Sequence, residues 1–440
     1  MKYAQIVSDI ICDTLLDPKV LQRARRRKGA FTRNCGKLPF WTVMKLLISN
    51  VKRTISATLD EFFSNLAKRA GIPLDETTQC TQQAFSKARS GIDHSIFKEC
   101  FDRILKFLCV QGAKEYLRRL SCGWDIIPIG IDGSKIQLPS RKKLLDSYGG
   151  MGQDASSPTA IASIAYDSLN DIVLDAQFEP LSVDERTLAK RHMMSIKSKD
   201  LTDLGHAMFV FDRGYASAEM FEYIQKDIGA RFLFRLKAQF NKKIDSIPDP
   251  QDQDSIVDES VTLDNGIRLR VVKLVLSSGI VETLVTNDFT QDKELFRKLY
   301  FMRWPCEEEY KLVKQKVGLT NFRGYSENSI LQEFWISMLL ANLVGVFRNE
   351  ADGIIKHDQL SKPNNKHGYK CNNNELIGCI SRHFPEYMDA ETKDEKASVI
   401  RYILKFAISH KVVDKKGSGE SSPRVKPRDC KNHYNSKSTH

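Results

Sequence analysis

The chain has 440 residues, of which 41% are hydrophobic and 28% are charged, and its formal net charge is +12. This length allows two or three domains with a substantial core, and the composition is that of a soluble globular protein. No apolar run approaches the roughly 20 residues that span a bilayer, and the N-terminus lacks a signal-peptide pattern, so we expect a cytoplasmic protein without membrane contact.

The first part of the chain, residues 1–118, is predicted to be helical. Residues 38–71 carry apolar side chains at intervals of three and four and end at a Gly that is followed by a Pro. A short polar helix with Lys87 and Arg89 comes next, and an amphipathic helix follows at 94–112. Short helices with basic side chains fit a helix-turn-helix that binds DNA, but any small helical domain has the same pattern.

The pattern changes near Trp124. Apolar strands alternate with helices: a strand through Asp132, a hairpin at 162–180, a helix at 184–198, a strand ending at Asp212, a helix at 217–230 and a strand at 231–237. This alternation predicts a mixed α/β sheet over 119–239. Three strands joined by turns then predict a β-rich insertion at 240–288, and helices return at 289–350.

The C-terminal part contains a helical region, 351–410, with an Asn-rich stretch that matches no motif, and a tail, 411–440. Residues 401–440 contain ten Lys or Arg and three Asp or Glu. The tail is rich in Ser, Pro and Asn and is predicted to be disordered, either as a polyanion-binding or as a solubilising segment. The ten cysteines form no CxxC pair, and the loosely spaced Cys371, Cys379 and His383 favour packing over a metal site.

Two aspartates stand on apolar strands. Asp132 lies inside IGIDGSKI and Asp212 ends MFVFD, and each is followed closely by Gly. Either alone could form a turn or cap a helix, but a buried carboxylate is costly without a partner. Together they suggest oxygen ligands for a divalent cation such as Mg²⁺, and two such ions can cleave a phosphodiester.

A third ligand is expected among three consecutive glutamates that follow Pro305, which fits the first turn of a helix. On a period of 3.6 residues, Glu308 points away from the apolar stripe of that helix, whereas Glu307 and Glu309 flank it on opposite sides. A solvated helix with matched charges is the alternative. Periodicity alone leaves Glu307 and Glu309 equivalent.

The same segment resembles the DDE transposases of bacterial insertion sequences, in the IS-four group. Their third motif, Tyr-x2-Arg-x3-Glu-x6-Lys, matches Tyr300, Arg303, Glu307 and Lys314 at every spacing, and it does not fit Glu309. The first motif resembles IGIDGS around Asp132, and the second resembles FDRGY and the following helix and strand after Asp212. The likeness covers residues 30 to 350 approximately.

The resemblance implies an RNase H-like core interrupted by the β-rich insertion, with an N-terminal DNA-binding domain at 1–118. It implies that Asp132, Asp212 and Glu307 hold two Mg²⁺ or Mn²⁺ ions. The residues expected to contact DNA are Tyr300, Arg303, Lys314, Arg213, Lys87, Arg89 and Trp304, the last by stacking on a flipped base. Core packing for Trp304 and a structural ion pair for Arg213 are the alternatives.

The predicted function is cut-and-paste transposition: binding of terminal inverted repeats, cleavage, and joining to target DNA by a homodimer on paired ends, in a bacterial, nucleoid-associated setting. One rival is a metal-dependent nuclease of the same fold. A second is a DNA-binding derivative without catalysis, which the intact carboxylate triad disfavours. A basic helical scaffold would leave Asp132 and Asp212 unexplained.

Overall fold

The protein is described by a computed structural model that covers residues 2–31, 38–49, 54–76, 79–111, 126–276, 278–299, 322–360 and 367–414. The helical N-terminal part contains α1 (Lys2–Leu16), α2 (Pro18–Ala24), α3 (Phe40–Ile48), α4 (Ile55–Arg69), α5 (Gln82–Arg89) and α6 (Ser95–Leu105). Side-chain caps start three of them: Asp17 accepts from the amides of Lys19 and Val20 ahead of α2, and Thr54 and Thr81 cap α4 and α5. The predicted helices are therefore present.

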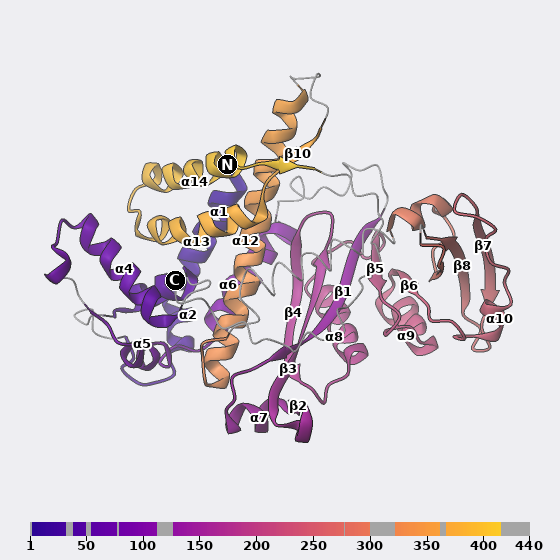
Figure 1. Ribbon diagram of the computed structural model, residues 1–440, viewed down its shortest axis with the longest axis horizontal. Helices are drawn as coiled ribbons and strands as arrows, with labels where there is room; N and C mark the ends of the chain where they lie inside the picture. Colours follow the sequence, from indigo (N-terminus) through magenta and orange to yellow (C-terminus); the bar gives the residue numbers. More distant parts are fainter. Residues whose placement is uncertain are drawn as a thin grey trace.

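A nine-stranded mixed sheet extends from the middle of the molecule to the end that holds β7 and β8 (Figure 1). Its strands are β1 (Ile127–Gln137), β2 (Gly150–Met151), β3 (Ser157–Asp167), β4 (Ile172–Pro180), β5 (Ala207–Phe211), β6 (Arg231–Arg235), β7 (Ile256–Thr262), β8 (Arg268–Val275) and β9 (Val281–Thr286). Between them lie α7 (Lys142–Tyr148), α8 (Glu185–Ser198), α9 (Ala218–Tyr223) and α10 (Lys242–Asp245). Residues 293–299 are helical as well.

The first five long strands give the core its topology. β4, β3 and β1 pair antiparallel, and β5 and β6 then follow β1 in parallel. An antiparallel hairpin next to two parallel strands is the order of an RNase H-like core, so the predicted fold is confirmed. β7, β8 and β9 are also present where strands were predicted, and β9 pairs with β6, so they extend the same sheet instead of forming a separate one.

Two helices cover opposite faces of β4. Asp175 and Gln177 contact α8, through His192 and the Leu188 carbonyl, whereas the Phe178 ring lies 5.0 Å from that of Phe334. Phe334 belongs to α12 (Glu327–Leu360), and side chains alternate between the two faces of a strand. β4 is therefore covered on both faces.

α12 is the central helix of the fold and lies between the sheet and the N- and C-terminal helices (Figure 1). It packs against α1, α6, α13 (Asn373–Asp389) and α14 (Lys393–Ser409), and β10 (Tyr369–Lys370) pairs with β11 (Val412–Val413) nearby. α12 is long and apolar enough to cross a membrane by composition, but 89% of its apolar window is buried inside the protein. Its hydrophobicity is thus accounted for by the core.

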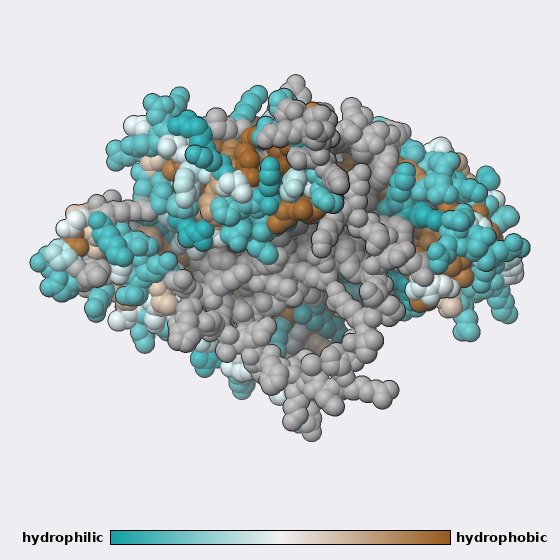
Figure 2. All heavy atoms as spheres, turned by 45° about the horizontal axis from the view of Figure 1, so that its top comes forward, coloured by the Kyte–Doolittle hydropathy of each residue, from teal (hydrophilic) through white to brown (hydrophobic). Residues whose placement is uncertain are grey.

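The Asn342 side chain of α12 contacts the edge of the sheet. Its carbonyl oxygen accepts from the Val173 amide at 2.7 Å, and its amide nitrogen donates to the Val173 carbonyl at 3.0 Å. Both backbone groups would otherwise be unpaired at the edge strand β4. The outer surface is different in character: Figure 2 shows mostly hydrophilic side chains on the coloured parts of the helical end and of the β7–β9 end.

Candidate active site

Asp132 and Asp212 occupy equivalent positions on neighbouring strands. In the parallel ladder of β1 and β5, Ile127 pairs with Ala207 and Gly130 with Val210, a constant offset of 80 residues. The same offset places Asp132 beside Asp212, two residues past the end of the ladder. Neighbouring strands lie about 4.8 Å apart, so the two aspartates are close neighbours, next to the C-terminal end of β5.

A buried ion-pair cluster stands next to Asp212. The guanidinium of Arg235, on β6, lies 3.8 Å from Asp212 Oδ1, and its Nε donates to Glu282 on β9. Only 2% of the Glu282 side chain is exposed, and Arg213 Nη2 is 3.6 Å from its other oxygen. Arg213 therefore makes an ion pair with a residue of β9, while 41% of its side chain is exposed, and the DNA contact predicted for it stays a prediction.

Gly133, the residue after Asp132 on β1, lies close to the phenol of Tyr215 and the carboxylate of Glu185. A Cβ built on Gly133 would lie 3.5 Å from Tyr215 Oη and 3.6 Å from Glu185 Oε1. Tyr215 is 2% exposed, and its hydroxyl interacts with the backbone amide of Gly133. Burial first, and then the charges of Asp132, Glu185 and Asp212, raise the pKa of Tyr215, so that the phenol stays protonated.

Arg186 fixes the turn that follows Asp212. It is the second residue of α8, whose N-cap Asp184 accepts from the amides of Arg186 and Thr187. Its guanidinium donates to the carbonyls of Gly214 and Ala216, at 3.3 and 3.2 Å. The start of α8 thus holds the Asp212–Ala216 turn in place and positions Glu185 beside β1.

A chain of buried hydrogen-bonded side chains contacts the backbone carbonyl of Asp132. Ser163 Oγ lies 3.1 Å from the Asp132 carbonyl oxygen and 2.9 Å from His192 Nε2. His192 Nδ1 is 2.6 Å from Asp175 Oδ2, and Ser195 donates to the other oxygen of that carboxylate. Because His192 and Ser163 are almost fully buried, this chain is structural and links α8 to the backbone of β1.

The two aspartates fit a hard divalent cation. Asp212 Oδ1 is a buried atom that accepts no hydrogen bond within the described part of the chain, and an oxygen in that state can serve as a cation ligand. Within the described ranges, no three acidic, His or Cys side chains are close enough to hold an ion by themselves. A metal centre here therefore requires a further ligand beyond those residues. Cys371 and Cys379, the thiols nearest to His383 in the sequence, are buried.

Five predicted site residues lie outside the described residues: Tyr300, Arg303, Trp304, Glu307 and Lys314. The choice between Glu307 and Glu309 rests on the sequence motif. Sequence reasoning missed Glu185, because a glutamate in the first turn of a helix after an Asp N-cap has an ordinary structural explanation. It also missed Arg186, whose partners are backbone carbonyls far along the chain.

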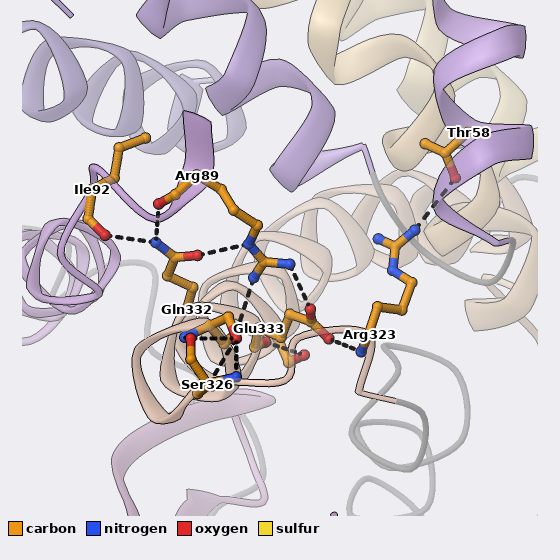
Figure 3. A network of polar contacts seen from close by, with 9 residues as sticks. Thr58, Arg89, Ile92, Arg323, Ser326, Gln332 and Glu333 are labelled. Carbon is orange, nitrogen blue, oxygen red and sulfur yellow. Dashed lines mark hydrogen bonds and ion pairs between the residues drawn. The ribbon is translucent and has the colours of Figure 1, made fainter. Parts of the chain in front are cut away.

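Lys87 and Arg89, both on α5, have different environments. Lys87 is exposed, whereas Arg89 is 4% exposed and donates to Gln332, Glu333 and the Ser329 carbonyl (Figure 3). All of these partners belong to α12. The predicted contact between Arg89 and DNA does not agree with this burial: the side chain joins two helices inside the protein.

Comparison with known proteins identifies a domain in the part of the chain that contains the sheet. The family model for the transposase DDE domain matches residues 125–343, about half of the chain, which include both aspartates. One similar solved structure is a piggyBac transposase synaptic complex with hairpin DNA, determined by cryo-electron microscopy. It has 9% identity and a TM-score of 0.46 over 90% of this chain and 85% of that one. No curated protein matches the chain. With its DDE domain at residues 125–343, the chain belongs to the DDE transposases.

Proposed function

We propose that this chain is a cut-and-paste transposase of a bacterial insertion sequence of the IS-four group. It binds the terminal inverted repeats of its element, hydrolyses a phosphodiester at each end and joins the freed 3′-hydroxyls to target DNA. The observation that carries the proposal is the placement of Asp132 and Asp212 side by side on neighbouring strands of an RNase H-like sheet, where Asp212 Oδ1 is buried and accepts no hydrogen bond from the described residues.

Asp132, Asp212 and Glu307 are the proposed ligands of two Mg²⁺ or Mn²⁺ ions. When bound, such ions lower the pKa of a water molecule and stabilise the leaving oxygen. In the first step a water oxygen forms a bond to phosphorus, and the bond from phosphorus to the 3′ oxygen breaks. In the second step the freed 3′-hydroxyl would form a bond to a phosphorus atom of the target and lose its proton, while the bond from that phosphorus to the target's 3′ oxygen breaks and the target strand leaves with a 3′-hydroxyl.

The remaining motif residues would hold DNA. Arg303 and Lys314 would contact phosphates, with the planar Arg fork better matched to phosphate geometry, and Tyr300 would hydrogen-bond to the same strand. Trp304 would stack on a flipped base. In the helical N-terminal domain, the exposed Lys87 replaces the buried Arg89 as our candidate for DNA contact.

Two ends must be cut together, so we propose a homodimer on paired ends, with nucleoid DNA as its cellular partner. The test uses a duplex made from the genomic sequence that flanks the gene, with Mn²⁺ and a supercoiled target plasmid. The proposal predicts cleavage at the inverted repeat and covalent joining to the plasmid. Cleavage without joining would identify a nuclease, and binding without cleavage a DNA-binding derivative.

A further inference from the structure

Asp212 belongs to a row of four charged residues on neighbouring strands of the core sheet. The strands lie in the order β1, β5, β6 and β9. The parallel ladder of β5 and β6 ends with the pair of Phe211 and Phe234, an offset of 23 residues. The same offset places Arg235 next to Asp212, on the side opposite Asp132.

Glu282, on β9, is the fourth residue of the row. Arg235 pairs with Leu284 in the antiparallel ladder of β6 and β9, and Glu282 lies two residues from Leu284, on the same face of its strand. The Nε of Arg235 donates to one Glu282 oxygen, and Arg213 Nη2 lies 3.6 Å from the other. Along the row the charges are therefore negative, negative, positive and negative.

The Arg235 guanidinium lies between two carboxylates and contacts them unequally. It is hydrogen-bonded to the buried Glu282, but its Nη1 stays 3.8 Å from Asp212 Oδ1, which is beyond hydrogen-bond distance. Asp212 Oδ1 is buried and accepts no hydrogen bond from the described residues, while the Asp212 side chain as a whole is partly exposed. Glu282 is thus the carboxylate that holds the arginine, and Asp212 keeps an oxygen for a cation.

The position of this guanidinium affects how strongly Asp212 can bind a cation. An arginine pairs with a carboxylate through two parallel hydrogen bonds where the geometry permits, and Arg235 would need to approach Asp212 by only about 1 Å to form them. Its positive charge would then also oppose a divalent cation at the same oxygen. Glu282 prevents both effects, because it holds the guanidinium by a hydrogen bond and offsets its charge.

We propose that Glu282 is a positioning residue of the metal site: it holds Arg235 back from Asp212, so that Asp212 Oδ1 stays available to Mg²⁺ or Mn²⁺. This inference rests on the proposed metal-dependent function. Glu282 acts through Arg235 and not as a metal ligand, since its two oxygens face two arginines.

The consequence concerns the strands that follow β6. Glu282 stands on β9, within the segment 240–288 that the sequence predicts as an insertion. This segment therefore takes part in the active site in addition to extending the sheet. It sets the affinity of the aspartates for the cation, although it supplies no ligand.

The experiment measures Mn²⁺ binding to the full-length protein without DNA, by calorimetry, and records a urea midpoint for every variant. Glu282→Gln removes the buried negative charge, Arg235→Gln removes the arginine, and the double variant removes both, which restores the local sum of charges. Asp212→Asn shows whether the measured binding belongs to the aspartates. The matched control is Asp288→Asn, because Asp288 is also buried and lies 3.3 Å from Arg231, at the opposite end of β6 from Arg235.

We expect Glu282→Gln to weaken Mn²⁺ binding about tenfold or more, because Arg235 then pairs with Asp212 and its charge is no longer offset. Arg235→Gln should bind Mn²⁺ at least as tightly as wild type, and the double variant should bind it within about threefold of wild type. Asp288→Asn should lower the urea midpoint but keep Mn²⁺ binding within about threefold of wild type, because it lies far from the aspartates. At saturating Mn²⁺, the rate of end cleavage by Glu282→Gln should approach that of wild type.

Wild-type Mn²⁺ binding in Glu282→Gln would overturn the inference. So would a loss of binding that the double variant does not recover, or one that Asp288→Asn shares, because the effect would then come from the fold. Weaker binding in Arg235→Gln would overturn it as well, and this variant decides the matter if Glu282→Gln does not fold. Absence of Asp212-dependent Mn²⁺ binding in wild type would instead refute the proposed metal centre, and the inference with it.

Discussion

Arg89 Nη1 and Glu333 Oε1 lie 2.9 Å apart in a buried ion pair that joins α5 of the N-terminal part to α12 of the core. The other Glu333 oxygen accepts from the Arg323 amide at 2.8 Å, and Arg323 Nη1 reaches Thr58 on α4 (Figure 3). Burial, opposed by Glu333, lowers the pKa of Arg323 to about 10. One carboxylate therefore links two N-terminal helices to the start of α12.

Replacing Glu333 with Gln should destabilise the protein, because the Arg89 guanidinium would remain buried without its counter-charge. Breaking a buried ion pair costs about 3–5 kcal/mol. The urea midpoint measures this loss. As a control, Glu222→Gln removes an exposed i,i+4 pair with Lys226 and should cost about 0.5 kcal/mol or less. Equal effects of the two substitutions would show that the network in Figure 3 does not hold the helices together.

Gly345 and Gly353 lie on the same helix, α12, in opposite environments. A Cβ on Gly345 would overlap the carbonyl oxygen of Asp171, in the hairpin turn between β3 and β4, whereas nothing lies within 4 Å of a Cβ on Gly353. Gly345→Ala should therefore lower the thermal midpoint, because backbone must move to accept it. Gly353→Ala should raise stability by up to about 1 kcal/mol, the helix preference of Ala over Gly. A stable Gly345→Ala protein would show that α12 does not pack closely on this turn.

Asp167 predicts a specific pH dependence. Burial raises the pKa of this carboxyl from its ordinary value of 3.8 to about 6, against opposing hydrogen bonds from Asn170 and Leu169. Because the folded-state pKa is the higher one, the folded protein binds the extra proton, and this contribution to stability is lost as pH rises from about 4 to 6. At pH 7 the cost of the buried charge is about 3 kcal/mol at most.

Asp167→Asn removes that charge and keeps a side-chain oxygen for the turn. We expect its free energy of unfolding, relative to wild type, to be more favourable at pH 7 than at pH 4. Urea unfolding at both pH values measures the difference. A difference between the two proteins that does not change with pH would mean that Asp167 has an unshifted pKa in the folded state.

Local sequence patterns were sufficient for much of the fold. The apolar strands, the hairpin at 162–180 and the helix at 184–198 follow from the spacing of apolar residues and from the turn residues. Asp132 and Asp212 were recognised as candidate site residues because burying a carboxylate on an apolar strand is costly without a partner. The RNase H-like order came from the family resemblance. The extension of the core sheet by β7–β9 was not predicted, because strand pairing depends on contacts between distant segments.

The errors and omissions at the site have the same cause. Arg89 lies in a polar segment that resembles an exposed helix, and its burial depends on Gln332 and Glu333, more than 240 residues later. Glu185 has the local signature of an N-terminal helix residue, and only the approach of Gly133 and Tyr215 relates it to the aspartates. Residue types indicated which side chains could act as ligands, bases or DNA contacts. Which of these side chains lie close together depends on the tertiary structure.

The measurement that most directly tests the proposed triad is Mn²⁺-dependent cleavage of the element's own ends by wild type, Asp132→Asn, Glu307→Gln and Glu309→Gln, each at matched end binding. The account predicts that Asp132→Asn and Glu307→Gln bind the ends and do not cleave them, because each removes a metal ligand, and that Glu309→Gln cleaves like wild type. Loss of cleavage in Glu309→Gln with activity retained in Glu307→Gln would contradict it, and would also remove the roles proposed for Arg303 and Lys314.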